Sequence, residues 1–308
     1  MSSGEQIVEC VPNFSEGSDE KKLRQIVQAM QVDGVRLLDF SMDRDHNRSV
    51  VTIAGPPEAV REAAVRAVGK AAELIDLTRQ TGVHPRIGAA DVVPFVPVKG
   101  MKLEQCALLA RQAGAEIWKR YKVPVYFYEA AAARPDRALL EDVRRGQFEG
   151  LRDAAAKDAS RRPDVGGPGL HPTAGASAVG ARRFLVAYNI YLDKPDVSVA
   201  RAVAREIRAS GGGMAGVKAM GVLANGRAQV SMNITDFRVT SVGMVYETVK
   251  RLALNHGAEP LSGELIGLIP EEAYEPDSEW ARQIGGFDPE SKVLERRLEK
   301  PLEWPIAG

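Results

Sequence analysis

The two halves of the chain have the same order of predicted strands and helices, and this repeat constrains the fold more than any other feature. In each half, apolar spacing predicts the order strand, helix, strand, strand, helix, strand. In the first half, the predicted strands are 6–14, 35–41, 48–55 and 91–98, and the predicted helices are 19–30 and 58–75. In the second half, the strands are 183–193, 217–223, 228–236 and 260–270, and the helices are 197–210 and 241–257.

This order is typical of the ferredoxin-like unit, a mixed or antiparallel sheet with helices on one face. We therefore expect an α/β (α+β) protein with two ferredoxin-like βαββαβ subdomains, at 1–178 and at 179–308, the second with a helical tail. A helix at 103–121 and a strand at 123–129 extend the first unit. A single mixed sheet that runs through both halves is the alternative. The segment 161–182, rich in Gly, Pro and Ala, is predicted to link the two units.

Three local features give finer predictions. Ser18 stands directly before the first helix and is a candidate N-cap. Pro94 and Pro97 lie in the last strand of the first unit and predict an edge strand or a bulge. Cys10 and Cys106 lie in apolar segments without metal-ligand spacing, so we expect reduced thiols in the core.

The overall charge excludes classes of partner that need a strong field. The 308 residues include 41 Lys and Arg and 41 Asp and Glu, so the formal net charge is zero. A chain without net charge has no general attraction for nucleic acid or for an anionic membrane, and an anionic ligand must be bound by local cations. The sequence shows neither the pattern of a signal peptide nor a long apolar run, so we expect a soluble, cytoplasmic protein with small-molecule partners.

The segment TGVHPRIGAAD, residues 81–91, contains one of only four histidines and has two interpretations. As a structural turn, it would have a solvated His84 and an ion pair between Arg86 and Asp91, and residue types alone favour this interpretation. As part of a site, it would hold the His84 imidazole at a fixed place on a loop, because Pro85 restricts the preceding residue to extended conformations. One His and one Asp do not form a metal-ligand set, so we expect no metal.

Three further segments carry polar or flexible residues whose simplest interpretation is structural. In VPNFSEG (11–17), Asn13, Ser15 and Glu16 lie where the chain turns from strand towards helix. The turn DRDHNRS (43–49) contains four charged residues and is typical of a solvated hairpin. The simplest interpretation of the glycines in 161–182 is that they belong to a linker.

Several blocks together nonetheless resemble one family. VECVPNFSEG, NRSVVTIAGPPEAV, ELIDLTRQTGVHPRIGAADVVPFVPV, VPVYFYEAAA, GARRFLVAYNI, AQVSMNITDF and GELIGLIP match, in order and spacing, the formiminotransferase domain of glutamate formiminotransferase. The resemblance extends from about residue 6 to residue 272. In animals this domain is fused to a cyclodeaminase, and the present chain resembles the monofunctional form.

The resemblance implies a fold, a reaction and a catalytic residue. The family has two α/β subdomains with a ligand cleft between them, and it is dimeric. It moves a formimino group between N-formimino-L-glutamate and tetrahydrofolate, its co-substrate, in histidine degradation and one-carbon metabolism. The family's catalytic histidine falls on His84, and an imidazole suits the reaction because it can accept a proton from the attacking nitrogen and return it to the leaving one.

The resemblance also implies a folate-binding loop, in which glycines allow close approach of the backbone to the ligand. The loop residues are Gly166, Gly167, Pro168, Gly169, Leu170, His171, Pro172, Thr173, Ala174 and Gly175. Some family members carry an aromatic residue in place of Ala174, so a stacking role is in doubt there. The candidates that bind carboxylates or orient the site are Asn13, Glu16, Asp39, Arg48, Arg86 and Arg182.

Three other functions, two enzymatic and one non-catalytic, fit the same residues. A 5-formyltetrahydrofolate:glutamate formyltransferase or a formiminoglutamate hydrolase would need the same imidazole. A non-catalytic protein that binds folate or an amino acid is the alternative of another class, because a fold alone does not determine function.

Overall fold

A computed structural model describes residues 5–82 and 84–306, which form two compact units. Unit 1 comprises the described residues up to Arg182 together with 301–306, and unit 2 comprises Arg183–Lys300. Each unit has its own sheet and its own hydrophobic core. The prediction of two α/β subdomains is therefore confirmed, and the alternative of one continuous sheet is wrong.

The sheet of unit 1 contains a ferredoxin-like core and two added strands. Its strands are β1 (Ile7–Cys10), β2 (Asn13–Phe14), β3 (Arg36–Asp43), β4 (Arg48–Gly55), β5 (Ala90–Lys99), β6 (Val125–Glu129) and β7 (Ser177–Ala181). Across the sheet, β3 lies next to β4, β1 and β2 together occupy the next position, and β5, β7 and β6 follow in that order. The first predicted strand is thus split into β1 and β2, and both pair with β4 and β5. The strands β7 and β6 extend the core in parallel to β5.

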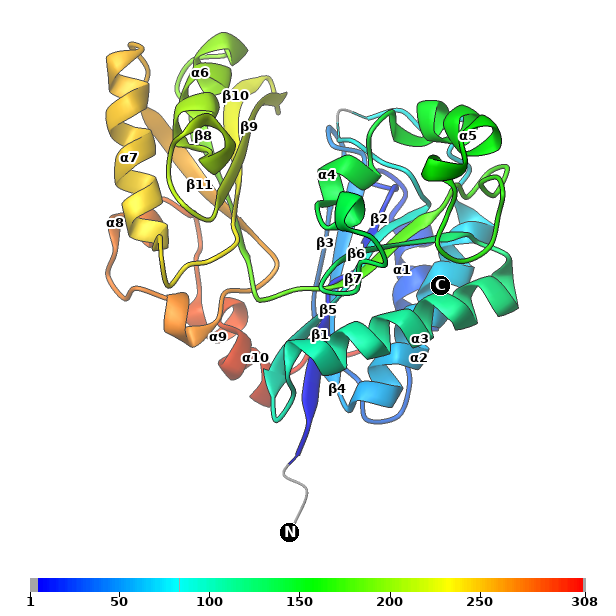
Figure 1. The fold of residues 1–308 in the computed structure, drawn as a ribbon. Coiled ribbons are helices and arrows are strands. Elements are labelled where there is room, and N and C mark those ends of the chain that lie inside the picture. The colour runs from blue at the N-terminus through cyan, green and yellow to red at the C-terminus, as the bar shows by residue number, and fades with distance from the viewer. Residues whose placement is uncertain (1–4, 83, 307–308) are drawn as a thin grey trace. The chain divides into compact units, whose positions relative to one another are not determined.

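Helices cover both faces of this sheet rather than the single face that we expected. The helices are α1 (Glu20–Ala29), α2 (Pro57–Leu74), α3 (Leu103–Tyr121), α4 (Leu140–Val143) and α5 (Gln147–Lys157), with short 3-10 turns at Pro135–Arg137 and Ala159–Arg161. Val125 and Phe127 of β6 belong to the core with α1, α2 and α3. Tyr126 and Tyr128 face the other way and pack with residues of α4 and α5. In Figure 1, α2 and α3 lie side by side, away from α4 and α5.

The strand β7 corrects the prediction of a linker at 161–182. It lies between β5 and β6 and is buried along its whole length. Its residues are small because both faces are covered: a Cβ on Gly180 would lie 2.5 Å from the Tyr128 ring. A strand without large or alternating apolar side chains gives no pattern that sequence analysis can use. Because β7 belongs to unit 1, the first segment of that unit continues to Arg182.

The finer predictions for unit 1 have mixed outcomes. The N-cap of α1 is Asp19, whose side chain accepts from the backbone of Lys21 and Lys22 at 3.0 and 3.2 Å, so the prediction of Ser18 is wrong. The strand β5 is central, so an edge position is wrong, but its pairing with β1 and β2 contains the predicted irregularities. Cys10 and Cys106 are free and buried, as predicted.

Unit 2 is a ferredoxin-like βαββαβ unit, as predicted. Its elements are β8 (Val186–Leu192), α6 (Val197–Ile207), β9 (Val217–Ala224), β10 (Arg227–Ile234), α7 (Val242–Asn255) and β11 (Pro260–Ile266), with the sheet order β11, β8, β10, β9. The turn between β9 and β10 uses Asn225 and Gly226 with φ of 52° and 68°, as a tight hairpin requires. Both α6 and α7 pack against this sheet and against each other (Figure 1).

The charged C-terminal segment forms short helices and a tail, as expected. After a 3-10 turn at Glu271–Ala273 come α8 (Glu279–Arg282), α9 (Pro289–Lys292) and α10 (Leu294–Glu299), and another 3-10 turn, Ala209–Gly211, follows α6. Trp280 packs edge-on against Tyr188 at 5.7 Å within the core of unit 2. The final tail returns to unit 1, where the Leu302 N–H donates to Leu37 at 2.7 Å. Over 5–82 and 84–306, no helix is long and apolar enough to cross a membrane.

We predict that Gly180→Ala destabilises unit 1 by about 1–3 kcal/mol, because the added methyl group overlaps the Tyr128 ring and the Tyr128 backbone oxygen. Urea unfolding monitored by circular dichroism would measure this loss. The matched control is Gly150→Ala in α5, where a Cβ meets no atom within 4 Å and helix propensity improves. Equal unfolding free energies of the two variants would contradict the close packing around β7.

Candidate active site

The loop that carries His84 connects α2 to β5 and pairs with the glycine-rich loop. Three backbone hydrogen bonds of 2.9–3.0 Å join the two segments: Leu77 N–H to Thr173 O, Ala89 N–H to Ala174 O, and Ala176 N–H to Ile87 O. The two motifs that the sequence singled out therefore lie side by side within unit 1. Gly175 has φ of +67°, and a Cβ there would lie 2.1 Å from Ile87 O. The close approach of the loops thus requires glycine at this position.

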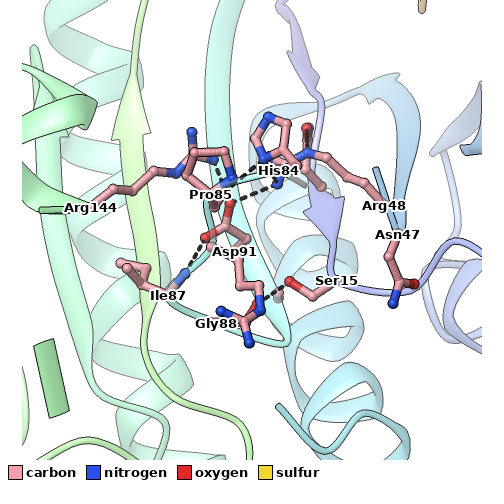
Figure 2. Close-up of polar contacts among 12 residues, drawn as sticks. Ser15, Asn47, Arg48, His84, Pro85, Ile87, Gly88, Asp91 and Arg144 are labelled. Atoms are coloured by element: carbon pink, nitrogen blue, oxygen red, sulfur yellow. Dashed lines mark hydrogen bonds and ion pairs between the residues drawn. The ribbon is translucent and has the colours of Figure 1, made fainter. Parts of the chain in front are cut away.

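Asp91 is the centre of the polar contacts around His84 (Figure 2). It is fully buried at the start of β5. Its Oδ1 accepts from the Ile87 N–H at 2.8 Å, and its Oδ2 accepts from Arg48 Nη1 at 2.8 Å and from Arg144 Nη2. Burial raises the pKa of Asp91, but Arg144 and Arg48 outweigh this effect and lower the pKa to about 2. The carboxylate is therefore ionised at neutral pH.

One ring nitrogen of His84, Nδ1, lies within hydrogen-bond distance of two neighbouring groups. Its Nδ1 lies 2.8 Å from Pro85 O and 3.0 Å from Arg48 Nη1. A carbonyl oxygen can only accept, so a proton on Nδ1 satisfies Pro85 and leaves the Nε2 lone pair available. In the other tautomer, Nδ1 accepts from Arg48. Burial, followed by the Arg48 and Arg144 cations, lowers the pKa of His84 to about 2, so the ring is neutral at pH 7.

The immediate surroundings of His84 carry an excess of positive charge. Arg48 and Arg144 share one carboxylate, Asp91, and the imidazole is neutral. A chain with zero net charge thus has a local cation surplus beside the imidazole, where an anionic group can be attracted.

Two of the six supporting candidates lie in this cluster. Arg48 contacts both His84 and Asp91. Asn13 in β2 orients it, since Asn13 Oδ1 accepts from Arg48 Nε at 2.9 Å.

Two other candidates have structural contacts instead. Arg86 is buried, donates to Gln80 and to Leu77 O, and pairs with Glu149 at 2.9 Å, so it fixes the loop. The structural-turn interpretation expected an ion pair between Arg86 and Asp91, and this expectation is wrong. Glu16 accepts from the Ser18 and Asp19 backbone at 2.9 and 3.0 Å and supports the start of α1.

The roles of Asp39 and Arg182 stay predictions. Asp39 lies in β3 opposite Thr52. Arg182 follows β7, and its N–H donates to Phe95 O at 3.1 Å.

The loop from Gly166 to Gly175 ends in a tight turn around His171. The backbones of His171 and Gly175 exchange two hydrogen bonds of 2.8 and 3.0 Å, and His171 Nδ1 accepts from the Ala174 N–H at 3.0 Å. Burial lowers the pKa of His171. Ala174 is buried in the core of unit 1 and presents no surface on which a ring could stack.

Three further residues support this cluster, and none of them is among the site candidates from the sequence. Arg144 directly follows α4, more than 50 residues from Asp91 in sequence, so no local pattern could reveal the pair. Asn47 accepts from the Gly17 N–H at 2.8 Å and donates to Thr81 O at 2.5 Å, so its hairpin holds the His84 loop and is not simply solvated. Ser15 Oγ donates to Gly88 O at 2.7 Å.

A second imidazole lies close to the first. The rings of His46 and His84 are 6.3 Å apart between centroids. His46 Nδ1 lies 3.1 Å from Asp43 Oδ1, which also accepts from the His46 backbone N–H at 2.8 Å. In the part of the chain that the structure describes, no group of three or more His, Cys, Asp or Glu side chains is arranged to hold a metal ion.

We predict that His84 makes the fold sensitive to mild acid. Between pH 7 and pH 5, an unfolded imidazole with a pKa of 6.5 takes up a proton, whereas the folded ring, with a pKa of about 2, does not. Protonation therefore favours the unfolded state, and His84 should cost about 2 kcal/mol of unfolding free energy over this interval. Urea unfolding at both pH values should show a correspondingly smaller loss for His84→Gln. The exposed His256 supplies the control variant His256→Gln. Identical losses in the native chain and in His84→Gln would contradict a folded-state His84 ring that stays neutral at pH 5.

Comparison with known proteins identifies the family. Residues 7–182 match the family model for the N-terminal subdomain of the formiminotransferase domain, and residues 187–280 match the model for the formiminotransferase domain. Glutamate formimidoyltransferases from Streptococcus pyogenes and Thermoplasma acidophilum are each 42% identical to the chain, over 95% and 96% of its length and 99% and 98% of theirs. The formimidoyltransferase-cyclodeaminase of Rattus norvegicus is 39% identical over 87% of the chain and 51% of the rat protein. The chain therefore belongs to the formiminotransferase family and is similar over nearly its whole length to the monofunctional glutamate formimidoyltransferases.

Proposed function

We propose that the protein is a glutamate formimidoyltransferase that moves a formimino group between N-formimino-L-glutamate and tetrahydrofolate, with His84 as general acid and base. Relatives named for this reaction are 42% identical to the chain over nearly its full length. The observation that carries the role of His84 is a half-buried, neutral imidazole whose Nδ1 lies within hydrogen-bond distance of Pro85 O and of Arg48 Nη1. The paired glycine-rich loop, Gly166–Gly175, supports folate binding beside it.

The chemistry needs a proton to move between two nitrogens. The attacking amine of tetrahydrofolate forms a bond to the amidine carbon, and the bond from that carbon to the glutamate nitrogen breaks. His84 accepts the proton that the attacking amine loses and donates it to the departing glutamate nitrogen, so the ring ends the cycle neutral. An imidazole that begins uncharged suits the first of these two steps.

The cation surplus supports both substrate binding and this proton transfer. Both substrates carry carboxylates, and Arg48 and Arg144 exceed Asp91 by one charge. A bound carboxylate would offset this excess and favour a transient imidazolium, because a nearby anion raises the pKa of an imidazole. The resting protein thus keeps His84 neutral until an anionic substrate enters. From the family resemblance alone, we also propose a homodimer, a cytoplasmic location, and a place in histidine degradation.

His84→Gln should lower the turnover of formimino transfer by about 10² to 10⁴-fold, because general acid–base catalysis is lost. Formation of the folate product from N-formimino-L-glutamate and tetrahydrofolate would be followed by absorbance, with His256→Gln as the control. Substituting 5-formyltetrahydrofolate and glutamate, or omitting folate, separates formyl transfer and hydrolysis from the proposed reaction. A native chain that binds folate but shows none of these turnovers would support the non-catalytic alternative.

Arg144→Gln should raise the KM for N-formimino-L-glutamate by about 10-fold or more, because it removes the excess cation and leaves Arg48 paired with Asp91. Steady-state kinetics would measure this change. The neighbouring Arg145 is exposed and pairs with Asp142, so Arg145→Gln serves as the matched control. Unchanged KM values in Arg144→Gln would show that the surplus charge does not attract substrate.

A further inference from the structure

The sheet of unit 2 carries a polar cluster on the face away from α6 and α7. In β8, the even-numbered residues belong to the core with these helices: Val186, Tyr188, Ile190 and Leu192. Because side chains alternate along a strand, Asn189 projects from the opposite face. Gln229 in β10 and Glu264 in β11 share that face, since their neighbours Val230 and Leu265 belong to the core. Glu264 lies directly opposite Asn189 in the strand register.

The three polar side chains contact one another. Asn189 Nδ2 donates to Glu264 Oε2 at 3.1 Å, and Gln229 Nε2 approaches the same oxygen at 3.4 Å. Gln229 is 0% exposed and Asn189 is 6% exposed. Over 5–82 and 84–306, the buried Gln229 Oε1 has no hydrogen-bond partner.

A buried carbonyl without a partner is unfavourable for the fold alone. It loses its hydrogen bonds to water on folding and gains none in return. An apolar side chain would fill the same place without this loss, but it would also remove the contact of Gln229 Nε2 with the Glu264 carboxylate. The cluster offers acceptors, since Glu264 is only partly buried and its carboxylate has a second oxygen, and the buried Gln229 carbonyl of the same cluster has no partner among the described residues. Its natural complement is therefore a group that donates N–H bonds.

We propose that Glu264, Gln229 and Asn189 bind a planar amidine-type group, with two adjacent N–H donors, on one of the two substrates. This assignment rests on the proposed function. The formimino group of N-formimino-L-glutamate is itself an amidine, and the 2-amino-4-oxopyrimidine ring of tetrahydrofolate presents the same pair of donors. A carboxylate binds such a pair through two parallel hydrogen bonds, as it binds the fork of an arginine.

The test compares Glu264→Gln with Glu259→Gln. The first variant replaces the carboxylate by an isosteric amide, and the second removes the same charge from an exposed residue just before β11. Isothermal titration with N-formimino-L-glutamate, with L-glutamate, and with tetrahydrofolate, each alone, measures the dissociation constants. We expect Glu264→Gln to raise the dissociation constant of one substrate by about 10- to 100-fold, because a hydrogen-bonded charge is lost. Glu259→Gln should bind all three compounds with the native dissociation constants.

The three titrations identify the source of the amidine group. If the binding of N-formimino-L-glutamate becomes weaker and the binding of L-glutamate does not change, the cluster binds the formimino group. Weaker binding of tetrahydrofolate alone assigns it to the pterin ring. Either pattern supports the proposal.

A second variant separates binding from a structural role. Gln229→Met removes both the unpartnered carbonyl and the 3.4 Å contact of Nε2 with Glu264 at similar volume, so its Tm should stay close to the native value while substrate affinity falls. Native affinities in both Glu264→Gln and Gln229→Met, with normal formimino transfer, would overturn the binding site and leave the proposed function intact. A native chain that binds neither substrate would overturn both.

Discussion

The buried carboxylate of Asp91 is the contact on which the His84 region depends. It neutralises part of the charge of Arg48 and Arg144 and also accepts from the Ile87 backbone. A buried ionised carboxylate without partners would be very unfavourable, and removal of one partner of a buried pair typically costs about 3–5 kcal/mol. Its position at the start of the central strand β5 makes this geometry rigid. The arginines, the loop backbone and the imidazole thus take their places relative to one fixed group.

The same cluster determines the protonation state of the imidazole. Burial and two nearby guanidinium groups disfavour the imidazolium more than a single carboxylate favours it. The ring is therefore neutral in the resting protein, although a histidine in water is partly charged near neutral pH. A chain with zero net charge thereby has a local excess of positive charge beside the imidazole, because the distribution of charges matters here and their sum does not.

Sequence analysis found the parts of the candidate site that lie within one motif. His84, the glycine-rich loop, Arg48 and Asn13 lie in blocks that resemble the family, whereas the sequence predicts Asp91 only as an ion-pair partner of Arg86. Arg144 and Asn47 could not be predicted in the same way, because their contacts join segments that are distant in sequence. Arg86 and Glu16 lie in motifs that match the family, and their side chains contact the loop and the start of α1.

The sequence alone determined the two ferredoxin-like units, because alternation and helical spacing are local properties that follow from the burial of one face of each strand or helix. It also determined the family, through motifs in a constant order. Only the tertiary structure decided that Ser177–Ala181 is a central strand, since small residues form a strand there only because neighbours cover both of its faces. It likewise decided the charge state of His84, because a pKa depends on burial and on charges that the chain brings together from distant positions.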